Sequence, residues 1–94
     1  MTTVVVRNDD ASRYEIVIDG EPAGHIDFTV DETSIELTHT EIDPAHQGAG
    51  LASILVRGTL DHLREHSDAR VIASCPYAAG WIAKHADYAE LTTR

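Results

Sequence analysis

The sequence contains one cysteine, few basic residues and no long hydrophobic run, and each shortage excludes a class of protein. With Cys75 as the only cysteine among 94 residues, an intrachain disulfide is impossible and a reducing compartment is expected. No apolar run approaches the roughly 18 to 20 residues needed to span a bilayer, and the N-terminus lacks the pattern of a signal peptide. We therefore expect a cytoplasmic protein with no membrane partner.

The shortage of basic residues also argues against nucleic acid as a partner. The chain has 7 Lys and Arg against 16 Asp and Glu, a formal net charge of −9, whereas nucleic-acid binding requires a cationic face. All of the excess lies in residues 1–43, because residues 44–94 hold equal numbers of acidic and basic side chains. Two interpretations stay open: the acidity keeps the protein soluble, or an acidic half attracts a cationic amine while the neutral half holds an anionic ligand.

The hydrophobic pattern predicts one domain of the α+β class over residues 1–94. β-Branched residues between turn signals predict four strands with short connections, an antiparallel meander over 3–8, 13–18, 24–30 and 34–42. Four further elements are predicted after it: an amphipathic helix over 51–65, a strand over 70–75, a helix opened by Pro76 over 76–85, and a last short strand over 88–92. The order β-β-β-β-α-β-α implies a mixed, mostly antiparallel sheet with two helices packed on it.

The alternation of apolar residues fails near the end of the fourth strand. Ile35 and Leu37 place the apolar face on odd positions, whereas Ile42 falls on the other parity. A one-residue bulge between His39 and Glu41 would restore the register and leave backbone N–H and C=O groups free for a ligand. The alternative is an ordinary polar strand end.

Residues 47–52 form a glycine-rich turn that leads directly into the first helix. Such a turn brings main-chain N–H groups close to a ligand, and the helix dipole favours an anion there. A Walker A loop is excluded because no lysine lies near Gly48 or Gly50. A Rossmann turn is disfavoured because Ser53 stands where its third small residue would be, and because the turn follows a meander.

Three residues of this turn match a known signature. Gln47, Gly50 and Ala52 occupy the defined positions of the Gln/Arg-x-x-Gly-x-Gly/Ala pattern, and the chain resembles the GNAT superfamily of N-acetyltransferases. Segments 37–41, 75–77 and 84–88 are similar to its short single-domain branch. The resemblance implies a GNAT-like fold, acetyl-CoA as co-substrate, and an amine acceptor on a small molecule, a protein lysine or an N-terminus. Ala49 departs from the branch, which often places a basic residue there, and this implies a lost phosphate contact.

The resemblance also implies roles for individual residues. Cofactor binding is implied for Thr40, Glu41, Ile42, Gln47, Gly48, Ala49, Gly50, Leu51, Ala52, Cys75 and Tyr77. The catalytic candidates are His39, Glu41, Cys75 and Tyr77. A backbone N–H near Glu41 or Ile42 would stabilise the thioester oxygen, and His39 or Glu41 would accept the amine proton. Tyr77 would protonate the departing CoA thiolate. No metal is expected, and a monomer is expected although the sequence leaves a dimer open.

Cys75 has three possible roles because it stands at a strand end just before Pro76. A helix N-terminus favours a thiolate, so the residue could accept the acyl group, contact CoA or simply fill the core. Direct transfer is favoured over a cysteine acyl-enzyme, since nothing in the sequence places a base beside this thiol. Two other functions stay open: a CoA or acyl-CoA binding module without efficient transfer, because so short a chain has little with which to shape an acceptor pocket, and a structural interaction domain.

Overall fold

A five-stranded sheet forms the base of the molecule, and the computed structural model describes residues 2–48 and 50–94 of the chain. The strands are β1 (Thr3–Asn8), β2 (Arg13–Ile18), β3 (Glu21–Val30), β4 (Ser34–Ile42) and β5 (Arg70–Ala73), in the order β1-β2-β3-β4-β5. The first four are antiparallel, and β5 pairs with β4 in parallel. The helices are η1 (Pro44–His46), α1 (Leu51–His66), α2 (Pro76–Lys84) and η2 (Ala86–Thr92). The predicted α+β class with a mostly antiparallel sheet is confirmed.

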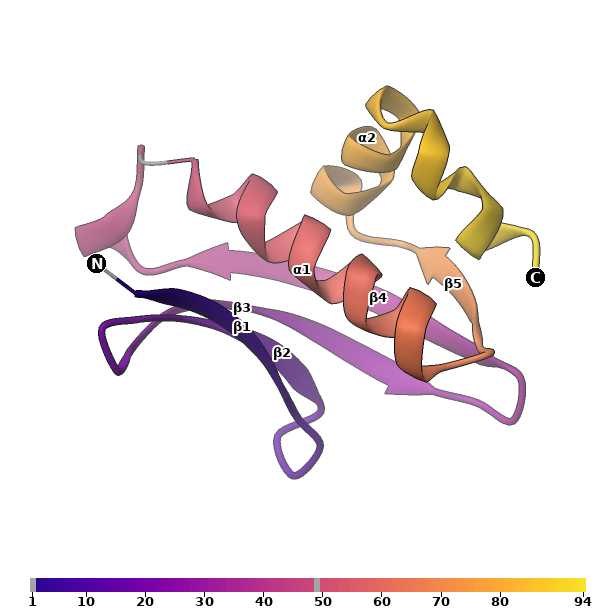
Figure 1. Ribbon diagram of the computed structural model, residues 1–94, viewed down its shortest axis with the longest axis horizontal. Helices are drawn as coiled ribbons and strands as arrows, with labels where there is room; N and C mark the ends of the chain where they lie inside the picture. Colours follow the sequence, from indigo (N-terminus) through magenta and orange to yellow (C-terminus); the bar gives the residue numbers. More distant parts are fainter. Residues whose placement is uncertain (1, 49) are drawn as a thin grey trace.

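Helix α1 lies across one face of the curled sheet, and α2 and η2 stand beside its second half (Figure 1). The buried face of α1 includes Leu55, Leu60 and Leu63, which are part of one hydrophobic core with the helix-facing residues of the strands. Gly58 lets α1 approach the edge strand closely, because a Cβ at this position would lie 2.6 Å from a methyl carbon of Val5. The other face of the sheet, called the open face below, carries no helix of the described chain.

Four boundaries differ from the predictions. Strand β3 begins at Glu21 rather than at 24, and β5 ends at Ala73 rather than at 75. The tail predicted as a strand over 88–92 is instead part of the 3-10 helix η2, because Tyr88 and Leu91 are buried three residues apart, the spacing of one 3-10 turn. The short helix η1 was not predicted. No helix in the described part of the chain is both long and apolar enough to cross a bilayer.

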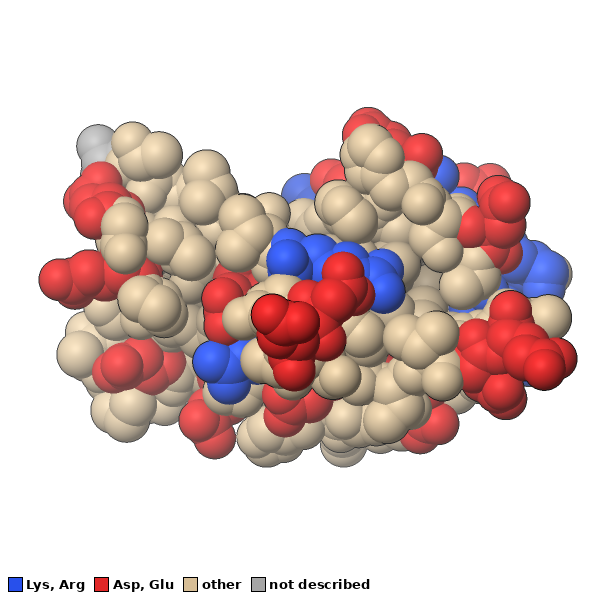
Figure 2. Space-filling model, turned by 90° about the horizontal axis from the view of Figure 1, so that it is seen from below, with Lys and Arg blue, Asp and Glu red and all other residues tan. Residues whose placement is uncertain are grey.

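The acidic first half of the chain keeps most of its charge uncompensated. Its two arginines are already paired, Arg7 with Asp9 at 2.7 Å and Arg13 with Glu15 at 2.9 Å. Figure 2 shows acidic side chains spread across most of the visible face, whereas basic side chains gather mainly near its middle. The remaining carboxylates of this half therefore give it a negative potential that its own cations do not cancel.

A bulge in β4 decides which of its side chains face the helices. Asp27 and Phe28 of β3 are paired with His39 and Leu37, so Thr38 is the extra residue. The sequence predicted a bulge in this strand but placed it later, between His39 and Glu41. Beyond Thr38 the even positions share the helix-side face with Leu37, and the odd positions face the opposite side.

Candidate functional site

Strands β4 and β5 separate halfway along β4 and leave an open strand edge. Their pairing runs only from Ser34 with Arg70 to Leu37 with Ala73. The backbone N–H groups of Ser74 and Cys75 both donate to the Leu37 carbonyl, at 3.0 and 2.9 Å. Beyond this point the chain turns away into α2, while β4 continues to Ile42. The second half of β4 therefore has no parallel neighbour among the described residues.

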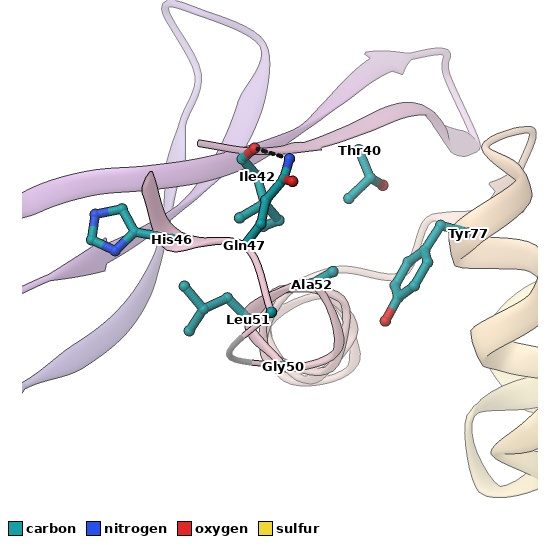
Figure 3. Close-up of a pocket in the computed structure, with 9 residues that line it drawn as sticks. Thr40, Ile42, His46, Gln47, Gly50, Leu51, Ala52 and Tyr77 are labelled. Carbon is teal, nitrogen blue, oxygen red and sulfur yellow. Dashed lines mark hydrogen bonds between the residues drawn. The ribbon is translucent and has the colours of Figure 1, made fainter. Parts of the chain in front are cut away.

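Alternate backbone groups of β4 point into this gap. The Asp43 N–H donates to the Ala23 carbonyl at 2.8 Å, so it faces β3. Because alternate residues of an antiparallel strand direct their amides to the same side, the amide of Glu41 also faces β3, and those of Thr40 and Ile42 face the gap. The Ile42 carbonyl confirms this direction, since it accepts a hydrogen bond at 3.3 Å from the Gln47 side chain across the cavity (Figure 3).

A cavity of about 310 Å³ lies between this open edge, the glycine turn and the start of α2. Its described lining comes from β4, the turn, α1 and α2: Thr40, Ile42, His46, Gln47, Gly48, Gly50, Leu51, Ala52 and Tyr77. Figure 3 shows Tyr77 extending from α2 toward the first residues of α1. The volume is within the range of small-molecule sites, and the mixture of apolar side chains with a few polar groups is typical of them.

The two glycines of the turn adopt backbone conformations that other residues rarely adopt. Gly48 has φ +88° and Gly50 has φ +72°, both in the left-handed region. No atom lies within 4 Å of a Cβ built at either position, so the space beside both glycines is open. Gly50 immediately precedes α1, and among the described residues no side chain caps this helix. The first N–H groups of α1, which lack partners within the helix, are therefore available to an anion.

Cys75 lies behind Thr40, at the point where the two strands separate. It is 4% exposed, and its sulfur lies 3.1 Å from the Thr40 hydroxyl. The pKa of its thiol is lower than its ordinary value: burial raises this pKa, but hydrogen bonds from Thr40 and from the backbone N–H groups of Ala78 and Tyr77 outweigh burial. The thiol is thus at the start of α2, next to the cavity lining but not part of it.

His39 and Glu41 do not reach the cavity. Both follow the bulge at odd positions, so their side chains lie on the open face, 59% and 63% exposed. The His39 Nε2 lies 3.5 Å from a carboxylate oxygen of Glu41, and the two form a pair on the far side of the strand. They are separated from the cavity by β4 itself.

The site therefore assembles most, but not all, of the residues predicted to bind the cofactor. The structure brings Thr40, Ile42, Gln47, Gly48, Gly50, Leu51, Ala52 and Tyr77 around one cavity, with Cys75 behind it. Ala49 lies outside the described residues. His46 also lines the cavity, although it was not among the predicted site residues; its place in the chain directly before Gln47 was the available signal.

A second and larger hollow, about 640 Å³, lies on the other side of the turn. It includes Asp19, Glu21 and Ile54. Two carboxylates in its wall disfavour an anionic ligand, so we assign the anion site to the smaller cavity on chemistry rather than on size. Over residues 2–48 and 50–94, no group of three or more His, Cys, Asp or Glu side chains is arranged to hold a metal ion.

Comparison with known proteins gives a family match and one structural likeness. The family described as GCN5-related N-acetyl-transferase matches residues 13–91 of the chain. Curated protein sequences give no match. The fold is similar to the crystal structure of a ribosomal-protein-alanine N-acetyltransferase from Brucella melitensis biovar Abortus 2308, with a TM-score of 0.56 and 21% identity. The likeness covers 68% of this chain and 50% of that one, so the chain spans about half the length of the protein it matches.

Proposed function

The chain belongs to the GCN5-related N-acetyltransferase family, and from this premise we propose that it binds acetyl-CoA beside β4 and transfers the acetyl group to an amine. In this proposal residues 1–94 form one acetyltransferase domain. The observation that carries the proposal is the convergence of two sets of available backbone N–H groups on one cavity. One set belongs to the open edge of β4, and the other to the first turn of α1.

The turn is suited to the pyrophosphate of CoA. Its two left-handed glycines leave open space, and the N–H groups that begin at Leu51 point out of the start of the helix. Phosphate groups bind at such helix starts because backbone donors and the helix dipole act together. The apolar side chains of Ile42 and Ala52 supply surface for the less polar arm of the cofactor.

The open edge of β4 is suited to the acyl end. Bound acetyl-CoA supplies the acetyl thioester, and the N–H of Ile42 points into the gap where a thioester oxygen would develop negative charge. The sequence assigned this role to Glu41 or Ile42. The register leaves Ile42, since the Glu41 amide faces β3. The Thr40 N–H is directed toward Cys75, so it is less available.

The acceptor amine would approach from the open face, where the acidic half of the chain attracts a cation. In this scheme His39 accepts the amine proton and Glu41 orients its imidazole. The new bond joins the amine nitrogen to the acetyl carbon as the carbon–sulfur bond breaks. The departing thiolate takes a proton from the Tyr77 hydroxyl or from solvent.

Direct transfer remains our proposal for Cys75. The contacts of its sulfur are a hydroxyl and backbone N–H groups, and no imidazole or carboxylate of the described chain bonds to it. A cysteine acyl-enzyme needs a base that carries protons for the thiol and the attacking amine. Cys75 is therefore placed to pack at the start of α2 rather than to accept the acyl group.

A second candidate, an acyl-CoA binding module without efficient transfer, is favoured by one observation. The described lining of the cavity contains no carboxylate, and His46 is its one titratable side chain near neutral pH. The proposed base lies on the opposite face of the strand, where an amine can reach it only through the gap.

An assay of CoA thiol release with acetyl-CoA and a panel of small amines and peptides separates these candidates. We expect amine-dependent release, with the acetylated amine found by mass spectrometry. Calorimetric CoA binding without release would favour the binding module. Absence of both would contradict the proposed function.

A further inference from the structure

The cavity described above has no lysine or arginine in its described lining, although CoA carries a pyrophosphate and a 3′-phosphate. Position 49, where related sequences often have a basic residue, is alanine. A chain with a net charge of −9 gains little from its overall field when it binds such an anion. A local cation near the cavity is therefore required, and the inference below rests on the proposed function.

A shallow hollow of about 240 Å³ continues the cavity along the outer side of α2. Its lining is Pro76, Tyr77, Gly80, Trp81 and Lys84. The two spaces share Tyr77, which is 43% exposed and extends from α2 toward the start of α1 (Figure 3). Trp81 fixes this side of α2 against α1, because its indole N–H donates to the Ser53 hydroxyl at 2.8 Å. A ligand leaving the turn therefore meets α2 along this strip.

Gly80 has no structural reason to be glycine. It lies inside α2, an exposed position in a nine-residue helix, and no atom lies within 4 Å of a Cβ built there. It has no positive φ. A glycine inside a helix costs about 1 kcal/mol relative to alanine. The bare backbone leaves room on the helix surface, next to the Tyr77 ring, for a flat group.

Lys84 is the cation at the end of this strip, and its charge is uncommitted in the described structure. Five of the seven basic side chains are engaged. Arg7, Arg13 and Arg64 form ion pairs, Arg57 bonds to the Tyr88 hydroxyl, and Arg94 bonds to backbone carbonyls. Among described contacts, only Arg70 and Lys84 have no side-chain partner. Arg70 begins β5, where that strand pairs with the start of β4, away from the gap.

We propose that the Tyr77–Gly80–Lys84 strip of α2 holds the nucleotide end of the cofactor. The adenosine lies over Gly80 beside Tyr77, and the ammonium group of Lys84 binds the 3′-phosphate. Lys84 then replaces the phosphate contact missing at position 49 and makes the protein select CoA over its 3′-dephospho form.

Calorimetry with CoA and 3′-dephospho-CoA tests the role of Lys84. The wild type should bind CoA about three- to fivefold more tightly than 3′-dephospho-CoA, the range of an exposed ion pair. Lys84→Met should remove this preference and leave the affinity for 3′-dephospho-CoA unchanged. The matched control is Arg70→Met, which removes an equally unpaired cation elsewhere and should keep the preference.

Two substitutions at Gly80 test the position of the adenosine. Gly80→Ala should raise the melting temperature by roughly 4–8 °C, because the helix gains stability. Gly80→Leu should keep a folded protein yet weaken CoA binding at least fivefold, since its side chain fills the strip.

The outcomes separate this inference from the proposed function. If the wild type binds CoA but Lys84→Met keeps the full preference, or Gly80→Leu keeps the wild-type affinity, the strip is not the nucleotide site although CoA binding stands. If the wild type binds neither compound, both the inference and the proposed function fail.

Discussion

The substitution Gly50→Val tests whether the turn backbone binds the cofactor. Gly50 has φ +72° and directly precedes α1, where the available N–H groups begin. A branched side chain there would project into open space beside the cavity, because no atom lies within 4 Å of the built Cβ. It would also resist the left-handed backbone that orients these groups.

Gly20 offers a matched control for the cost of the backbone strain. It has φ +85° in the turn between β2 and β3, and again no atom lies within 4 Å of its built Cβ. A left-handed conformation costs an ordinary residue about 1–2 kcal/mol, and a β-branched residue more. We therefore expect Gly50→Val and Gly20→Val to lower the free energy of unfolding by similar amounts, each about 2 kcal/mol.

The effect on binding should differ sharply between the two variants. Hydrogen bonds to a charged group contribute about 1.5–3 kcal/mol each. Loss of two N–H contacts to phosphate at Gly50→Val would therefore cost about 3 kcal/mol or more, which raises the Kd for CoA roughly 100-fold. Gly20→Val lies far from the turn in the sheet and should keep the wild-type Kd.

Urea unfolding and calorimetric titration with CoA measure the two effects separately. A Gly50→Val protein that is folded and binds CoA with the wild-type Kd would refute the assignment of the turn. An equal loss of affinity in Gly20→Val would refute it too, because the loss would then follow general destabilisation.

Two further predictions concern catalysis and pH. Cys75→Ala should keep a measurable rate of amine acetylation, whereas His39→Ala or Glu41→Gln should lower kcat about 100-fold or more, as expected for loss of a general base. A dead Cys75→Ala enzyme, together with an acetyl group on Cys75 that an amine then removes, would show that direct transfer is wrong. For stability, burial and the nearby His66 lower the pKa of His62 below its ordinary 6.5, and the ring bonds to the Tyr14 hydroxyl at 2.8 Å. The unfolded chain therefore takes up the proton first, so this contribution is full above pH 6.5 and is lost as pH falls through the folded pKa. His62→Gln should flatten the fall in unfolding free energy between about pH 7 and 5, and parallel wild-type and variant curves would contradict this.

The first two strands could be predicted closely because local pattern determines them. In β2 the buried residues Tyr14, Ile16 and Ile18 alternate without interruption, and the bounds 13–18 are confirmed. The start of β3 was missed because Glu21 and Pro22 resemble turn residues. In the structure Pro22 lies close to an irregularity in the pairing between Ile16 and Val17, where a missing N–H donor is tolerated.

The orientation of the proposed base shows why the site was harder to predict than the fold. Parity alone required one extra residue somewhere before Ile42, but a bulge at Thr38 and a bulge at Glu41 place His39 on opposite faces of the sheet. The cavity wall formed by Tyr77 depends on contacts between distant segments, such as the Trp81 bond to Ser53. No local pattern encodes either feature.

The central claim is that the open edge of β4 and the glycine turn together bind CoA. The most direct measurement is a titration of the ¹⁵N-labelled protein with CoA, followed by amide chemical shifts. The account predicts the largest changes at Thr40, Ile42, Gly50 and Leu51. Changes confined to the amides around Asp19 in the larger hollow, or no changes at saturating CoA, would contradict it.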